Sequence, residues 1–210
     1  QLVFSKKFKI DLPGGKWTLA TKYFWNFHGL NITEYVLLKI ENSEMMEAII
    51  VSEAKLGGIV TGQLDPILYE IMFKNKYDGC YERPEYFLLK FYAQGNVHNC
   101  LTVRHFDIMK EINYPDDPEM KGANRQLNNW IKKNSVIIPK ISLHSNHSYF
   151  SRHMGSNWYV IDYHANPKIY NAPKNKFYSE ENSEYHKYNI ENFPEHKKVM
   201  DKWVSISAER

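Results

Sequence analysis

The sequence has little of what marks nucleic-acid binding, membrane insertion or a known class of catalytic site. Most of its 27 basic residues are lysine, and arginine is the residue best suited to bidentate contacts with phosphate and guanine. No run of like charge suggests a basic arm. No stretch approaches the roughly 18 consecutive apolar residues that a membrane helix needs. A glycine-rich phosphate loop, a His-Glu-x-x-His pair and a Gly-x-Ser-x-Gly elbow are all missing.

Cysteine is also scarce, with only Cys80 and Cys100 in the chain. A disulfide between them would close a loop of roughly 20 residues and would stabilise the fold by about 3 kcal/mol in the chain-entropy model. Two buried free thiols in a reducing cytosol are the alternative. The even count favours the disulfide. So does the start at Gln1 rather than Met, which fits the removal of a leader and an oxidising compartment.

Aromatic residues, in contrast, are abundant. The chain of 210 residues suits a single domain, residues 1–210, and is long enough for a sizeable core. Aromatic side chains make up 15% of it, and each can bury about 150–250 Å². The net charge of +3 is mildly basic and decides little.

Alternating patterns and turn signals predict an antiparallel sheet built from hairpins. Runs at 34–41 and 45–53 flank Asn42-Ser43, and runs at 85–93 and 97–107 flank Gly95-Asn96. Residues 17–27 alternate strictly, which places Trp17, Tyr23, Trp25 and Phe27 on one face of a half-buried strand.

Capping signals predict about three helices. One opens at Asp65-Pro66, a second follows Asp117-Pro118 and is expected to end at Asn134, and a third begins at Pro194 and occupies 194–210. Between sheet and last helix, 165–193 has no clean periodicity, and we expect a long ordered loop pinned by its aromatic side chains. The helical pattern persists to Arg210, which leaves open that the natural chain continues. The expected fold class is α+β, an antiparallel sheet with the helices packed on one side.

The segment from His144 to His164 contains four of the nine histidines and is predicted to form a hairpin. If Gly155-Ser156 is a two-residue turn, His147 faces His164 and Tyr149 faces Asp162. These four side chains then share one face of the sheet.

Such a cluster has a coherent metal chemistry. Imidazole nitrogens of His147 and His164 with the carboxylate of Asp162 are ligands that Zn²⁺ accepts, and a fourth position would remain for water. Tyr149 could donate a hydrogen bond to a bound oxyanion. The alternative is a solvated polar sheet face, and a change of register by one residue removes the cluster.

Three segments carry a resemblance to known proteins. Ile10-Asp-Leu-Pro-Gly-Gly-Lys-Trp17 resembles the opening of several exported bacterial domains, in which a short strand and a Pro-Gly turn lead to a tryptophan. Phe73-Lys-Asn-Lys-Tyr-Asp-Gly-Cys80 and Phe193-Pro-Glu-His-Lys-Lys are similar to segments of an uncharacterised exported family of marine bacteria. The resemblance implies export to the periplasm or the medium and a Cys80–Cys100 disulfide. It implies no activity and no functional residues.

The leading functional hypothesis is a non-catalytic exported domain that binds another protein chain or itself. It depends on the aromatic excess and on the missing catalytic motifs. The enzyme hypothesis is less favoured: a metal-dependent hydrolase with zinc at His147, Asp162 and His164. A second alternative is a carbohydrate- or small-ligand-binding module with exposed tryptophan and tyrosine rings. We expect no cofactor apart from that zinc, no nucleic-acid partner and no transmembrane segment.

Overall fold

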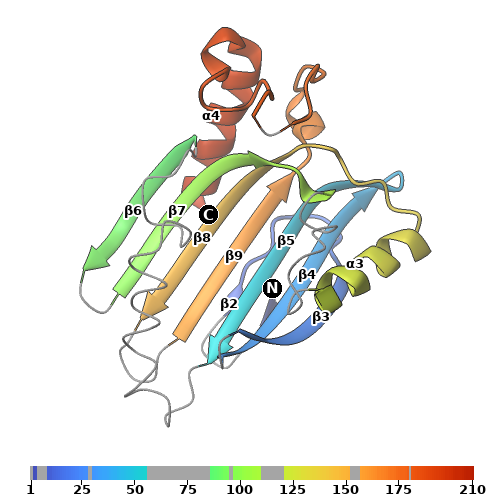
Figure 1. Ribbon diagram of the computed structural model, residues 1–210, viewed down its shortest axis with the longest axis vertical. Coiled ribbons are helices and arrows are strands. Elements are labelled where there is room, and N and C mark those ends of the chain that lie inside the picture. The colour runs from blue at the N-terminus through green and yellow to red at the C-terminus, as the bar shows by residue number, and fades with distance from the viewer. Residues whose placement is uncertain are drawn as a thin grey trace.

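A seven-stranded antiparallel sheet in the order β3-β4-β5-β9-β8-β7-β6 organises the protein, as the computed structural model in Figure 1 shows. The structure describes residues 2–3, 9–27, 30–55, 86–94, 97–109, 121–151, 157–179 and 181–210. The strands of the large sheet are β3 (Thr18–Phe27), β4 (Leu30–Glu41), β5 (Glu44–Lys55), β6 (Phe87–Gln94), β7 (Val97–Phe106), β8 (Ser142–Ser151) and β9 (Asn157–Ala165). Two short strands, β1 (Leu2–Val3) and β2 (Lys9–Ile10), pair with each other in a separate sheet. The expected antiparallel α+β architecture is confirmed.

Local turn chemistry explains the hairpins. Asn42 and Ser43, between β4 and β5, have φ angles of 50° and 62°. Positive φ at both central residues is the conformation that matches the twist of a two-residue hairpin, and asparagine tolerates it better than most residues. The second expected hairpin is also present, because β6 and β7 pair on either side of Gly95-Asn96.

A bulge in β3 divides the expected aromatic stripe between the two faces of the sheet. Leu19 pairs with Leu37, but Thr21 pairs with Val36, so Ala20 is the extra residue. An extra residue inverts the alternation beyond it. Trp17 therefore packs against the core on one face, whereas Tyr23 and Trp25 project from the other, opposite Glu34 and Ile32.

The two α-helices that the structure describes lie on opposite faces of the sheet. α3 (Lys121–Lys133) lies against β3, and its Leu127 and Ile131 join a buried cluster with residues of β3, β4 and β5. Its expected end is confirmed, because Asn134 donates from its side chain to the carbonyl of Trp130. α4 (Pro194–Glu209) starts at the expected proline and packs Trp203 against the opposite face. Neither helix is long and apolar enough to cross a membrane.

This two-sided arrangement corrects the expectation that the helices share one side. Val36, Leu38 and Ala48 are buried on the side that we call the α3 face. Ile49 and Val51 are buried on the other, which we call the α4 face. Because both faces carry apolar side chains, a helix layer on one side would leave the other exposed. The helix expected at Asp65-Pro66 lies outside the described residues, as does the expected start of α3 at Asp117-Pro118.

The segment 165–193 contains two short 3₁₀ helices, η2 (Pro167–Tyr170) and η3 (Ile190–Asn192). Only some of its aromatic residues anchor it. Tyr185 is completely buried, but Phe177 is 51% exposed and Tyr188 is 72% exposed. The expectation of an ordered loop pinned by aromatic side chains is therefore right at Tyr185 and wrong at these two positions.

Candidate functional site

The expected pairing of the histidine hairpin is wrong. β8 and β9 do pair, but His144 rather than His147 lies opposite His164, and His147 lies opposite Ile161. The turn expected at Gly155-Ser156 lies outside the described residues. A shift of three residues, like any odd shift, moves a side chain to the other face of the sheet.

The shift separates the residues of the expected zinc site. Asp162 and His164 lie on the α3 face, whereas His147 and Tyr149 lie on the α4 face. Tyr149 is opposite Tyr159 instead of Asp162, and their rings stack at a centroid distance of 6.4 Å. Among the described residues, no group of three or more histidine, cysteine, aspartate or glutamate side chains is arranged to hold a metal ion. The zinc hypothesis therefore loses the geometry on which it was built.

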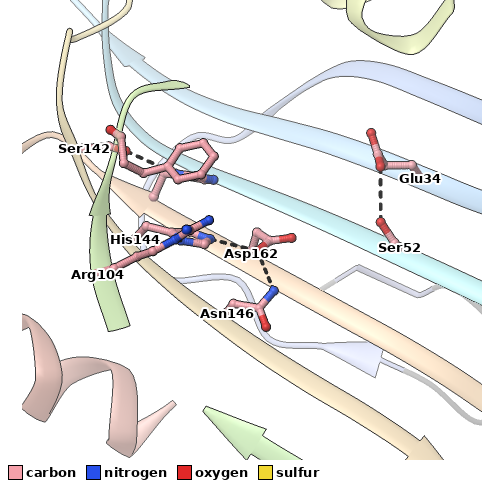
Figure 2. Close-up of polar contacts among 9 residues, drawn as sticks. Glu34, Ser52, Arg104, Ser142, His144, Asn146 and Asp162 are labelled. Atoms are coloured by element: carbon pink, nitrogen blue, oxygen red, sulfur yellow. Dashed lines mark hydrogen bonds and ion pairs between the residues drawn. The ribbon is translucent and has the colours of Figure 1, made fainter. Parts of the chain in front are cut away.

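Asp162 is the centre of a polar cluster on the α3 face, shown in Figure 2. Its Oδ1 atom accepts hydrogen bonds from His144 Nε2 at 2.8 Å and from Asn146 Nδ2 at 2.7 Å. Burial raises the pKa of Asp162, but these two donors more than offset it and hold the pKa below its usual value. The carboxylate is thus ionised at neutral pH. The sequence analysis overlooked His144 because the expected register placed it beyond the hairpin pairs.

The hydrogen bonds also fix the protonation state of His144. Arg104 Nε donates to its Nδ1 atom at 3.3 Å, so Nδ1 must be an acceptor and Nε2 must carry the proton. Burial lowers the pKa of His144, and the Arg104 charge adds to this effect against the opposing influence of Asp162. His144 is therefore a neutral imidazole that links a guanidinium to a carboxylate.

Ser142 and His164 form a second pair in the same cluster. The Ser142 hydroxyl donates to the Phe106 carbonyl at 3.2 Å and lies 3.2 Å from His164 Nδ1. Since a carbonyl can only accept, the hydroxyl proton is directed to Phe106, and Ser142 accepts from His164. A serine activated for nucleophilic attack would instead donate to the imidazole. Ser142 is also completely buried, so the pair has a positioning role.

One further polar contact lies on this face. Ser52 donates to Glu34 at 3.2 Å, from β5 to β4, and Figure 2 places this pair apart from the cluster around Asp162. In the cluster itself, most of the polar atoms bond to one another. Such an arrangement fixes side chains and strand register, and it has the character of a structural network.

The α4 face carries a different feature, a cavity of about 330 Å³. The N-terminal segment, the sheet and the end of α4 line it, and it is partly open to solvent. Its apolar wall is formed by Ile10, Leu12, Pro13, Ile49, Leu101 and Ile161. Its polar lining is formed by Asp11, Ser145, His147, Tyr163, Ser207 and Arg210. This volume is at the lower end of the range of small-molecule sites, which are mostly apolar with a few placed polar groups.

Three polar residues of the cavity lining have defined states. His147 Nε2 bonds to the Asn99 side-chain oxygen at 2.7 Å, which makes it a donor, and burial lowers its pKa. Ser207 is only 7% exposed, and its hydroxyl has no hydrogen-bond partner among the described residues. The Arg210 guanidinium carbon lies 4.2 Å from the centroid of the Tyr163 ring. The cavity thus offers a positive charge and an unused hydroxyl beside an apolar wall.

The expected Cys80–Cys100 disulfide remains a prediction. Cys100 is completely buried in β7, and Cys80 lies outside the described residues.

No protein-family model, no curated protein and no solved structure matches the chain significantly. The resemblance to an exported bacterial family therefore finds no support in these comparisons.

Proposed function

We propose that this protein is a binding domain that holds a small, mainly apolar molecule in the cavity on the α4 face. The observation that carries the proposal is the cavity itself, in which the Ser207 hydroxyl is buried without a partner. A buried hydroxyl without a hydrogen bond costs about 1–3 kcal/mol. A ligand would remove this cost if the Ser207 side chain rotated so that its hydroxyl reached the cavity.

The enclosing elements support a ligand-binding role. Ile10 and Leu12 close the cavity from the N-terminal segment, and Trp17 holds that segment in place by donating to the Pro13 carbonyl at 2.7 Å. The floor consists of sheet residues such as Leu101, which is 4% exposed. The cavity is partly open to solvent, so a ligand can enter it without a movement of the sheet.

A cavity-filling variant tests the proposal. Ile161→Trp should remove the binding of apolar probes, because the larger side chain occupies the space of the ligand. Ile137→Trp is the matched control, since it makes the same substitution at a position that is 62% exposed and outside the cavity. Binding is measured by isothermal titration with 1-decanol and by native mass spectrometry for a co-purified molecule. Equal probe binding by both variants would reject the cavity as the site.

A second candidate function is association with another protein chain or with a second copy. Phe24 is 66% exposed and Leu19 is 50% exposed, and both lie on β3, the terminal strand of the sheet. Lys22 and the bulge at Ala20 are features that discourage simple edge-to-edge pairing. The contact would therefore use these apolar side chains. A mass that rises with concentration in the natural sequence, but not in Phe24→Glu, would support it; a monomer at all concentrations would reject self-association.

Export to the periplasm or the medium, with the Cys80–Cys100 disulfide, remains part of the proposal. Mass spectrometry of non-reduced protein, isolated from its natural compartment, tests both together. A single species two protons lighter than the dithiol form is expected. Two free thiols in that sample would contradict the disulfide.

A further inference from the structure

We infer that the ligand of this cavity is an amphipathic organic monocarboxylate, with its carboxylate against Arg210 and its apolar body against the sheet. The inference rests on the proposed function, since it specifies which molecule the cavity selects. It depends on three features of the lining: its volume, its charge and its unused hydrogen-bond donor.

The volume sets the size of the ligand. An apolar cavity of about 150 Å³ is large enough for benzene, so a cavity of about 330 Å³ suits a larger body. By simple proportion this corresponds to roughly ten to fifteen non-hydrogen atoms. Ile49, Leu101 and Ile161 line the part that lies on the sheet, and they offer no hydrogen bond to a polar body. An aromatic acid or a fatty acid of medium chain length meets both conditions.

Arg210 sets the sign of the charge. Its guanidinium stacks on Tyr163, and it has no carboxylate partner among the described residues. Asp11 at the same cavity has an interaction of its own. The planar guanidinium presents paired N–H donors that match the two oxygens of a carboxylate.

Ser207 supplies the remaining donor. It lies in the last turn of α4, and Arg210 follows as the C-cap residue, so both residues line the cavity from the end of the helix. Among the described residues no group bonds to its buried hydroxyl, which a rotation of the side chain would bring to the ligand. A carboxylate that accepts from both residues would remove the unpaired donor and the unpaired charge together. His147 is neutral because burial lowers its pKa, so it adds no second cation.

Three probes of nearly equal size separate the contribution of the charge to the affinity from the contribution of the apolar chain. Decanoate, 1-decanol and decylammonium are titrated into the full chain at pH 7.5, and the methyl signals of Ile49 and Leu101 are followed by NMR. Decanoate should bind at least about tenfold more tightly than 1-decanol, the scale of one charged hydrogen bond. Decylammonium should bind more weakly than 1-decanol. The advantage of decanoate should decrease at high salt.

Variants assign the preference to its residues. Arg210→Met should remove the advantage of decanoate and leave the affinity for 1-decanol unchanged. Arg125→Met is the control, because it removes an exposed charge on α3, far from the cavity lining. Ser207→Ala should weaken decanoate a few-fold without lowering the stability of the ligand-free protein.

The outcomes distinguish this inference from the function on which it rests. Equal binding of decanoate and 1-decanol, or a preference for decylammonium, would overturn the carboxylate inference and leave a ligand-binding cavity in place. If none of the three probes shifts the cavity methyl signals, both the inference and the proposed function fail.

Discussion

His144 and His164 lie directly opposite each other on β8 and β9, and their rings stack with centroids 4.5 Å apart at an angle of 18°. Each ring uses a different nitrogen as its donor. His144 donates from Nε2 to Asp162, and His164 donates from Nδ1 to Ser142. Two stacked imidazolium cations would repel each other in a buried site, so the two rings cannot both be charged, and burial lowers the pKa of each.

We therefore predict that the fold loses stability in mild acid. Burial is the largest cause that lowers the pKa of His144, of His147, of His164 and of His196. The unfolded chain then binds more protons than the folded one below pH 6.5, so the free energy of unfolding must fall with decreasing pH. Each histidine contributes a slope of up to about 1.4 kcal/mol per pH unit. Urea denaturation between pH 8 and pH 4.5 measures it.

A variant identifies the stacked pair as a source of this slope. His164→Phe keeps a ring against His144 but cannot take up a proton, so its stability should depend less steeply on pH. Asp162 affects stability at lower pH than the histidines do. Because its pKa is lowered in the folded state, it stabilises the fold at pH values above its ordinary pKa of 3.8, and this contribution disappears in stronger acid. An unchanged slope in His164→Phe would show that the stacked pair does not titrate with unfolding.

A second prediction concerns the link between Arg104 and His144. Arg104→Met removes the donor to Nδ1 and the nearby positive charge but retains an apolar stem beside Phe106. The pKa of His144 should rise, because Asp162 then acts on it without opposition from Arg104. NMR titration of the imidazole Cε1–H signal measures this change. With Arg125→Met as the exposed control, an equal pKa of His144 in both variants would contradict the proposed network.

The sequence predicts the elements of this fold better than their pairing. Turn and capping residues determine the backbone only of their neighbours along the chain. The β4–β5 turn and the helix ends therefore occur where the sequence indicates them, at Asn42-Ser43, Asn134 and Pro194. The register of β8 on β9 is different, because β7 and β5 flank the pair and their packing also selects it. A two-residue turn assumed at Gly155-Ser156 therefore gave the wrong partners for His147.

The cavity could not be predicted for a related reason. Its lining comes from the N-terminal segment, four strands and the end of α4. No local pattern connects Leu12, Leu101 and Ser207, since only the tertiary fold brings them together. The bulge at Ala20 is similar: it interrupts the alternation without a glycine or proline to mark it, and it moved Tyr23 and Trp25 away from the face of Trp17.

Two buried tyrosines give a third prediction, with opposite results for the same substitution. Tyr163 donates to Glu47, which is 6% exposed and also binds Lys39 at 2.9 Å. Tyr163→Phe leaves one oxygen of this carboxylate unpaired and should cost about 1–3 kcal/mol. Within the described part of the chain, the hydroxyl of Tyr185 has no hydrogen-bond partner, so Tyr185→Phe should be neutral or stabilising. Urea denaturation measures the free energy of unfolding of both variants. Equal losses of stability would contradict the hydrogen-bond assignments.

A fourth prediction compares two contacts of the loop after β9 with the β4–β5 turn. Asn166 is 4% exposed; its side chain donates to Glu44 at 3.0 Å and to the Met45 carbonyl at 3.1 Å, and accepts from the Lys168 amide at 3.1 Å. Asn166→Ala leaves buried groups unpaired and should cost about 2–3 kcal/mol.

Lys168 also binds Glu44, at 2.6 Å, but its side chain is 67% exposed. Lys168→Met should cost less than about 1 kcal/mol, because water and salt screen an exposed ion pair. Thermal unfolding of the two variants tests this order, and a larger loss for Lys168→Met would mean that the ion pair, not the buried amide, fixes the loop.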